Sequence, residues 1–417
     1  MAKKKLNMRK IHLTTHFYKY FCSVKRKSSI LNRLILLFVV MFTTINSRAA
    51  GDVGIEYYDS VEIGLITCTP HEEIYSLYGH TALRLHNLHN GDDLSFNYGV
   101  FNYNQPLFVP RFVFGKTDYE LGIAPFGEFC KYYEHWGSQV SELVLNLTAV
   151  EKARIVKALF ENYEPENRVY RYNFFFDNCA TRPRDVIERG IDGRIVYPQP
   201  QGEAPSFRDM IHDHTQLHPW AAMGNDLLLG VRADMSTTQR ERHFLPENLE
   251  RDFRGAVIIA ADGKQRPLVT ERRIVVKPGV QLVEPGFPLS PTACGILLMV
   301  AAAVVFVCEW RRKRTLVWVD AVLMTLMGLA GCLLVLMLFS EHPATSSNLQ
   351  VLLLNPLHLL FLPSVVRRRR TTRYWTLLLA LLALFILGGL WQHYAEGMWF
   401  LALCLLTRYW SHTRNDK

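Results

Sequence analysis

The feature that most constrains this chain is a series of apolar runs in its last third. Four runs, at 292–308, 316–339, 349–366 and 374–391, are about as long as a bilayer-spanning helix requires. A shorter run, 398–406, extends with its flanking residues to a fifth. Four such runs in succession are difficult to bury in a water-soluble core. We therefore expect an all-α transmembrane domain of five helices at 292–410, followed by a cytoplasmic tail at 411–417.

The loops between the apolar runs predict an orientation. Loops 309–315 and 367–373 hold four and five basic residues, whereas loops 340–348 and 392–397 hold none. Basic loops remain in the cytoplasm, so everything before the first span is predicted to lie outside it. The loop at 340–348 then faces the same side as the preceding domain. Because polar groups at membrane depth are often functional, we predict that His342 and Asn348 of this loop bind substrate.

The N-terminus is typical of an export signal. Residues 1–33 hold ten Lys and Arg and no acidic residue, and a short apolar core, "LILLFVVMFTT", follows at 34–44. Small residues in "NSRAA" supply a cleavage site near Ala49 or Ala50. We assign 1–50 to a signal peptide, with an uncleaved anchor as the alternative. Either one delivers the next domain across the membrane.

The net charge of +9 belongs to the two ends of the chain. The leader carries +10 and the part from residue 292 onward carries +7, which leaves −8 for residues 34–291. Nucleic-acid binding needs Lys and Arg clustered on a folded surface, so this acidic middle argues against a nucleic-acid partner.

Residues 51–291 are predicted to form one exported domain with mixed α and β structure. Alternation and strand composition predict strands at 61–69, 81–87, 94–100 and 141–148, with a further strand through "VYRYNFFF" and a late hairpin at 255–276. Apolar residues at helical spacing predict a helix at 149–163, and further helices are expected in "PSFRDMIHDH" and "GNDLLLGVRAD". The fold class is therefore α+β, followed by the all-α membrane domain.

One short stretch, "NFFFDNCATRPRD" at 173–185, carries the first chemical signal. Proline is tolerated in a helix only in its first turn, so a helix through Pro183 begins close to Cys179. Asp177 and Asn178 are natural capping residues there. Unpaired amides and the positive end of the helix dipole lower the pKa of a thiol at this position. Cys179 is thus a candidate nucleophile, and a small core residue is the alternative.

A thiolate nucleophile needs a basic partner, which is usually histidine. His80 opens the strand at 81–87, directly after Gly79, so its ring can be held rigidly. The neighbouring strand offers Asn97 as a group that could orient the ring. Cys179, His80 and Asn97 together form a possible catalytic triad.

The remaining cysteines and histidines give weaker signals. Cys68 and Cys130 are the other thiols of the exported domain, and a bridge between them would leave Cys179 free. The histidines of "HDHTQLH" (212–218) lack the further ligands of a zinc site. We therefore expect no metal.

With these residues in hand, the chain resembles the Lnb family of bacterial lipoprotein N-acyltransferases. The resemblance rests on "YGHTALRL", "FNYGVF", "YNFFFDNCATRPRD", "HPWAAMGNDLLLG" and "FLPENL", followed by a membrane tail with "EHPATSSNLQVLLLNPL". It covers nearly everything after the leader, and the motifs keep the family order. It implies an exported domain with a permuted papain-like, NlpC-type fold, in which histidine precedes cysteine. It also implies an inner-membrane protein with its N-terminal domain in the periplasm.

What the resemblance implies is a thiol acyltransferase. Cys179 takes a fatty acyl chain from a phospholipid as a thioester, and His80 activates the thiol. The acceptor is the α-amine of a diacylated lipoprotein, and no nucleotide or other cofactor is required. Tyr78 and Asn178, which adjoin the catalytic residues in these motifs, are assigned to substrate binding. The alternatives are a membrane-bound papain-like hydrolase, acting on phospholipid or cell wall, and an envelope protein that binds without catalysis.

Overall fold

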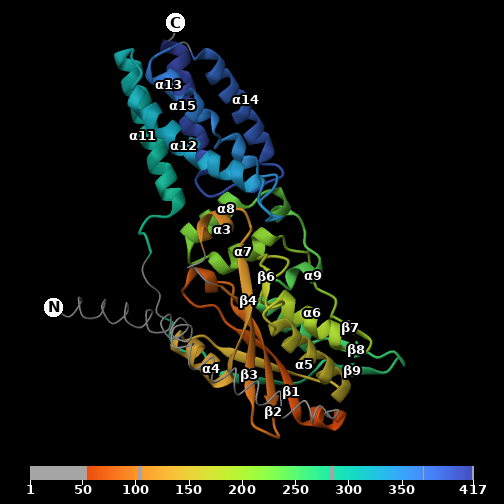
Figure 1. The fold of residues 1–417 in the computed structure, drawn as a ribbon. Helices are drawn as coiled ribbons and strands as arrows, with labels where there is room; N and C mark the ends of the chain where they lie inside the picture. The colour runs from red at the N-terminus through yellow and green to blue at the C-terminus, as the bar shows by residue number, and fades with distance from the viewer. Residues whose placement is uncertain (1–53, 102–105, 282–285, 370, 416–417) are drawn as a thin grey trace, which may run out of the picture. The chain divides into compact units, whose positions relative to one another are not determined.

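The computed structural model describes residues 54–101, 106–281, 286–369 and 371–415. The predicted signal peptide at 1–50 lies outside the described residues. The described chain contains an α+β domain followed by a helical domain (Figure 1).

The elements of the α+β domain follow one another closely along the chain. Its strands are β1 (Val61–Cys68), β2 (His80–Asn87), β3 (Asp93–Val100), β4 (Asp118–Pro125), β5 (Val140–Leu145), β6 (Val169–Arg171), β7 (Arg194–Val196), β8 (Val257–Ile259), β9 (Gln265–Pro267) and β10 (Val269–Val276). Its α-helices are α3 (Phe108–Val113), α4 (Phe126–His135), α5 (Ala149–Tyr163), α6 (Thr181–Gly190), α7 (Phe207–Thr215), α8 (Pro219–Leu228), α9 (Gln239–Arg242) and α10 (Pro246–Arg254). Short 3-10 helices lie at η1 (Ile55–Ser60), η2 (Ile74–Ser76) and η3 (Val231–Asp234).

A seven-stranded antiparallel sheet, in the order β10-β5-β1-β2-β3-β4-β6, organises this domain. Alternate strand residues point to opposite faces, so each face builds its own core. One face packs against α5, α6 and α10 in the largest apolar cluster, which includes Leu65, Leu83 and Phe96. The other face packs against α4 through Phe126, Phe129 and Tyr133. The start of β2 and the start of α6 meet in this frame.

The strands predicted at 61–69, 81–87, 94–100 and 141–148 are confirmed as β1, β2, β3 and β5, and the predicted helix at 149–163 is confirmed as α5. Thr148 caps that helix in a capping box with Glu151. The helix expected in "PSFRDMIHDH" is confirmed as α7, whereas the one expected through "GNDLLLGVRAD" is divided, since α8 ends at Leu228 and η3 begins at Val231.

Two strand predictions were wrong in their extent. β6 ends at Arg171, and the phenylalanines after it form a turn, because Asn173 Oδ1 accepts from the N–H groups of Phe175 and Phe176. The turn directs Phe175 into a separate apolar cluster with α7. The predicted hairpin at 255–276 holds only for β8 and β9, since β10 pairs with β5 in the large sheet instead.

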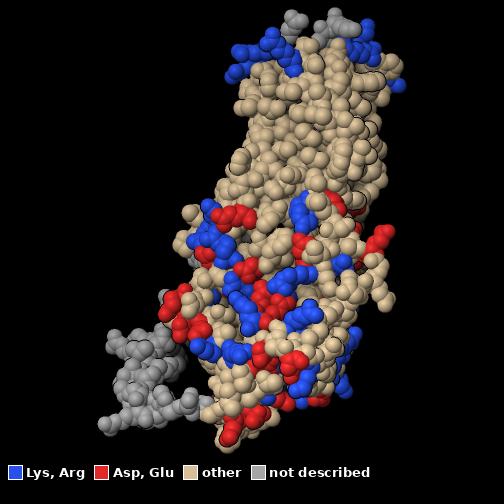
Figure 2. Space-filling view, turned by 90° about the vertical axis from the view of Figure 1, so that its right-hand side faces the viewer, with Lys and Arg blue, Asp and Glu red and all other residues tan. Residues whose placement is uncertain are grey.

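The helical domain comprises α11 (Pro291–Arg312), α12 (Val317–Leu338), η4 (Leu349–Leu352), α13 (Leu357–Val366), α14 (Thr372–Gly388) and α15 (Met398–Asn415). Asn355 and Pro356 lie in the break between η4 and α13. Lys and Arg residues gather at the end of this domain away from the α+β domain (Figure 2).

Three segments among the described residues are long and apolar enough to cross a membrane: Pro291–Arg312, Val317–Leu338 and Leu349–Val366. Thr372–Gly388 is a shorter apolar helix. Charged residues near the end of α15, including Arg408 and Arg414, make this helix less apolar than the other four. Five membrane spans therefore remain a prediction.

Candidate active site

Cys179 lies where the chain enters α6. It directly precedes Ala180, the N-cap residue, so the expected position beside a helix N-terminus is confirmed. The Asn178 side chain accepts from the N–H groups of Ala180 and Thr181, each at 2.9 Å. Thr181 Oγ1 in turn accepts from the Asn178 N–H at 2.8 Å. These bonds hold the half-buried cysteine in a fixed turn.

His80 and Asn97 lie on the same face of the sheet, on the neighbouring strands β2 and β3. His80 is the first residue of β2 and pairs with Cys68 on β1. Its Nε2 is hydrogen-bonded to Asn97 Oδ1, which leaves Nδ1 for the thiol. The side chains of His80 and Cys179 are hydrogen-bonded to each other. The structure thus brings the predicted Cys179, His80 and Asn97 together.

The electrostatics of the pair favour a thiolate and an imidazolium. Burial acts to raise the pKa of the Cys179 thiol, but the charge and hydrogen bond of His80, together with the backbone N–H groups of Thr81 and Cys179, bring that pKa below its usual value. Burial likewise acts to lower the pKa of His80, and the bonds to Cys179 and Asn97 outweigh it, so this pKa is raised. Each partner therefore stabilises the charged form of the other.

A glycine forms the irregular end of β3 beside Cys179. Gly99 has φ of +98°, a conformation that L side chains rarely adopt, and it lies where the β3–β4 register shifts. A Cβ placed there would lie 3.7 Å from the Cβ of Cys179. That distance is an ordinary van der Waals contact, so Gly99 is required for its backbone conformation rather than for space.

The sequence analysis did not identify two residues that lie near the dyad of Cys179 and His80. The Tyr133 ring lies parallel to the His80 ring, with their centroids 6.3 Å apart. His71 is buried and stacks on Trp136 at 4.8 Å. Burial, with a smaller contribution from the charge of His80, lowers the pKa of His71 to about 4. It is therefore a neutral ring beside a charged one. No pattern around "TPHEE" signals this burial.

Tyr78 lies two residues before His80 and contacts α8. The Tyr78 hydroxyl accepts from Asn225 Nδ2 at 2.7 Å, and its ring packs edge-on against Phe174. Gly79, with φ of +72°, makes the turn between Tyr78 and His80. Tyr78 is thus close to the reacting groups, and its assignment to substrate binding stays a prediction.

The other three residues assigned to substrate have structural contacts. Asn178 is 1% exposed, and besides capping α6 it donates to the carbonyls of Phe174 and Phe244. Asn348 is buried and donates to the Leu227 carbonyl. His342 is in the same outer loop, which packs against the α+β domain through Ala344. Substrate contact by these three stays a prediction, and Asn178 and Asn348 have little exposed surface with which to make it.

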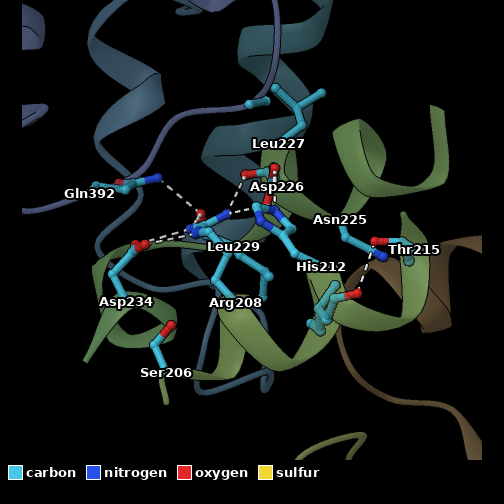
Figure 3. Close-up of polar contacts among 12 residues, drawn as sticks. Ser206, Arg208, His212, Thr215, Asn225, Asp226, Leu227, Leu229, Asp234 and Gln392 are labelled. Atoms are coloured by element: carbon cyan, nitrogen blue, oxygen red, sulfur yellow. Dashed lines mark hydrogen bonds and ion pairs between the residues drawn. The ribbon is translucent and has the colours of Figure 1, made fainter. Parts of the chain in front are cut away.

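A polar network joins the α+β domain to the helical domain (Figure 3). Arg208 on α7 is ion-paired with Asp226 at 2.6 Å and with Asp234 at 2.8 Å. His212 donates to the same Asp226. Gln392, from the loop between α14 and α15, donates to the Leu229 carbonyl at 2.9 Å. The two loops without basic residues, 340–348 and 392–397, were predicted to lie on the same side as the exported domain. Both contact that domain.

Metal ligation has no support from the histidines of α7. His212 is engaged by Asp226, and His214 lies 3.5 Å from Glu247. Across the described residues, no three His, Cys, Asp or Glu side chains are grouped to hold a metal ion.

The fold and the site define a membrane-associated protein whose α+β domain carries a cysteine–histidine–asparagine constellation. Models of the Lnb N-terminal periplasmic domain and the Lnb transmembrane domain match residues 56–209 and 283–417. The chain therefore belongs to the Lnb family. Comparison with curated proteins and with solved structures gave no significant match. The family models support a membrane protein with a periplasmic domain.

Proposed function

We propose that this protein is a lipoprotein N-acyltransferase that works through an acyl thioester on Cys179. The observation that carries the proposal is the Cys179–His80–Asn97 constellation, with its lowered thiol pKa, on a domain seated against the outer loops of apolar helices. Family membership supports a lipid-related role. The donor would be a phospholipid and the acceptor the α-amine of a diacylated lipoprotein.

In the first half-reaction the Cys179 thiolate attacks an ester carbonyl of the phospholipid. The carbonyl oxygen becomes an oxyanion, and the Cys179 backbone N–H is our candidate donor to it. When the intermediate collapses, the C–O bond breaks and the His80 imidazolium gives its proton to the departing alcohol. The products are a lysophospholipid and an acyl thioester on Cys179.

In the second half-reaction the lipoprotein amine attacks the thioester carbonyl. Neutral His80 accepts the proton that the amine loses, and the Cys179 thiolate leaves as the C–S bond breaks. Asn97 keeps the ring in the orientation that serves both steps, since it holds Nε2 while Nδ1 exchanges the proton. An amide is more stable than a thioester, so the transfer needs no nucleotide.

The architecture also supports the permuted papain-like assignment. A cysteine at the start of a helix that packs on an antiparallel sheet, with its histidine on a sheet strand, is the arrangement of that class. Here His80 on β2 precedes Cys179 before α6. A hydrolase would use the same groups with water as the acceptor.

The test is the intact mass of the full-length protein after incubation with phosphatidylethanolamine. Wild type should gain one fatty acyl mass that hydroxylamine removes, and Cys179→Ala should gain none. Cys130→Ala is the matched control, because burial raises the pKa of the half-buried Cys130 to about 11 and makes it a poor nucleophile.

Adding a diacylated lipopeptide should then discharge the acyl group and yield an N-acylated product. If the acyl group is lost at the same rate with and without lipopeptide, and no N-acylated product forms, the protein is a hydrolase. No acyl mass under conditions in which lipopeptide is still acylated would refute the thioester mechanism. Neither acyl mass nor acylation would favour a binding protein.

A further inference from the structure

A cavity of about 620 Å³ lies where α7 and α8 meet the outer ends of the helical domain, away from Cys179. Its walls come from α7 and α8 on one side, and from Thr292 of α11, the loop between α14 and α15 and the start of α15 on the other. Its volume is typical of a site for a small ligand or a head group. Nothing in the thioester mechanism uses it.

One wall of the cavity is polar and carries two imidazoles. His212 Nε2 lies 2.9 Å from both carboxylate oxygens of Asp226, so its Nδ1 remains for another partner (Figure 3). The His393 ring centroid lies 5.7 Å from that of His212. Because Arg208 already pairs with Asp226, this carboxylate is neutralised from two sides. The imidazole rings of His212 and His393 can therefore donate hydrogen bonds to a bound anion.

A carboxylate lines the same cavity. Glu396 precedes α15 and is held by Thr292 at the start of α11, whose N–H donates to it at 3.1 Å. The hydrogen bond to Asp226 is the largest cause of a raised pKa at His212, which favours its cationic form. Cationic and anionic groups thus share one cavity, a combination that suits a zwitterion better than a simple anion.

Apolar side chains form another part of the lining. Met223 of α8, Trp399 and Phe400 contribute to it. Trp220 of α8 and Trp391 are exposed close to the cavity in sequence, and both belong to the residue type that concentrates at lipid head groups. An amphipathic ligand could place its polar part on the imidazoles and its chains toward Trp399.

The two helices that form the cavity also contact the active site. Asn225, beside Asp226 on α8, donates to the Tyr78 hydroxyl, and the His214 ring on α7 lies 5.8 Å from the Tyr78 ring. Tyr78 is two residues before His80. The helices that line the cavity are therefore linked to the dyad through Tyr78.

We propose that this cavity binds the head group of one outer-leaflet zwitterionic phospholipid. The phosphate lies against His212 and His393, the ammonium group against Glu396, and the acyl chains start along Trp399. That this lipid serves as the acyl donor rests on the proposed function. The binding itself does not.

The binding test uses the full-length protein carrying Cys179→Ala, in detergent, so that no turnover occurs. Native mass spectrometry should show one retained phosphatidylethanolamine. His393→Glu places an acid where the phosphate lies, and we expect about tenfold weaker binding, since charge-assisted hydrogen bonds of this kind contribute about that much. His89→Glu makes the same change on the exposed β2–β3 turn and should have no effect.

Three further ligands separate the possible sources of binding. Phosphatidylglycerol, which lacks the ammonium group, should bind more weakly than phosphatidylethanolamine, and Glu396→Gln should remove that preference. Diacylglycerol, which lacks the head group, should not be retained. Glycerophosphoethanolamine, which lacks the chains, should compete at least a hundredfold less well.

A cavity-filling pair guards against indirect effects. Ala222→Trp fills the cavity and should abolish lipid retention. Gly224→Trp, two residues further along α8 where an added side chain meets open space, should not. Equal retention by all variants, retention of diacylglycerol, or equal competition by glycerophosphoethanolamine would each overturn the proposal. Because Cys179 is absent throughout, failure of the thioester mechanism would leave these results unchanged.

Discussion

Asn178 offers the sharpest test of how the nucleophile is held. Its side chain makes four hydrogen bonds at 2.8 to 2.9 Å: it accepts from two N–H groups at the start of α6 and donates to two carbonyls, those of Phe174 and Phe244. It is 1% exposed, so water cannot replace those partners. We predict that Asn178→Ala destabilises the periplasmic domain rather than weakening substrate binding.

The size of the effect follows from the groups left unpaired. Loss of a side chain that accepts from the first N–H groups of a helix costs about 1 kcal/mol, and each buried carbonyl or amide without a partner costs about 1 to 3 kcal/mol. Two amides and two carbonyls lose this partner, so about 4 kcal/mol is expected after partial relaxation. In a domain of this size 1 kcal/mol shifts the midpoint by about 2 to 4 °C, and the apparent Tm should fall by roughly 10 °C.

The assay is thermal unfolding of the full-length protein in detergent at a fixed scan rate, followed by intrinsic fluorescence. Asn90→Ala is the control, because Asn90 makes its hydrogen bonds in an exposed turn and should shift the Tm by under about 2 °C. An unchanged Tm for Asn178→Ala, combined with a raised KM for phospholipid, would refute the capping argument. That result would restore Asn178 as a substrate ligand.

Three further predictions address the dyad and the helical domain. Alkylation of Cys179 by iodoacetamide should stay fast below the usual thiol pKa, and His80→Ala should move the midpoint of the pH–rate profile upward. Asn97→Ala should lower kcat about ten- to a hundredfold with little change in KM in the lipopeptide acylation assay, since it removes only the group that orients the ring. Arg408→Ala removes the guanidinium that pairs with two buried carboxylates, those of Glu309 and Asp320, and should cost about 3 to 5 kcal/mol in unfolding experiments, whereas exposed Arg414→Ala should cost little.

The parts of the site that sequence predicts are those set by local rules. Pro183 limits where α6 can begin, and this alone places Cys179 beside a helix N-terminus. The alternation of apolar residues along β2 and β3 puts His80 and Asn97 on neighbouring strands. Each of these inferences needs only residues a few positions apart. For that reason they survive without knowledge of the tertiary fold.

The parts that sequence does not predict depend on distant partners. Arg408 on α15 binds Glu309 on α11 and Asp320 on α12, at sequence separations of 99 and 88. The periodicity of apolar residues does not predict which buried charged residues will pair. The strand prediction for the phenylalanine run at 174–176 was wrong for a related reason. Its composition favours a strand, but the side chain of Asn173 accepts hydrogen bonds from the following N–H groups and stabilises a turn.

The polar residues at the outer end of the helical domain also have a structural role. Helices end with carbonyls that lack intrahelical partners, and at the end of α8 these lie against the helical domain. Amides from that domain satisfy them: Gln350 donates to the Asp226 carbonyl at 2.8 Å and Asn348 to the Leu227 carbonyl at 2.8 Å. The helical domain thus fixes the end of α8, α8 fixes Tyr78 through Asn225, and Tyr78 adjoins the turn that presents His80. Polar side chains at this end of the helical domain therefore support the catalytic pair through packing.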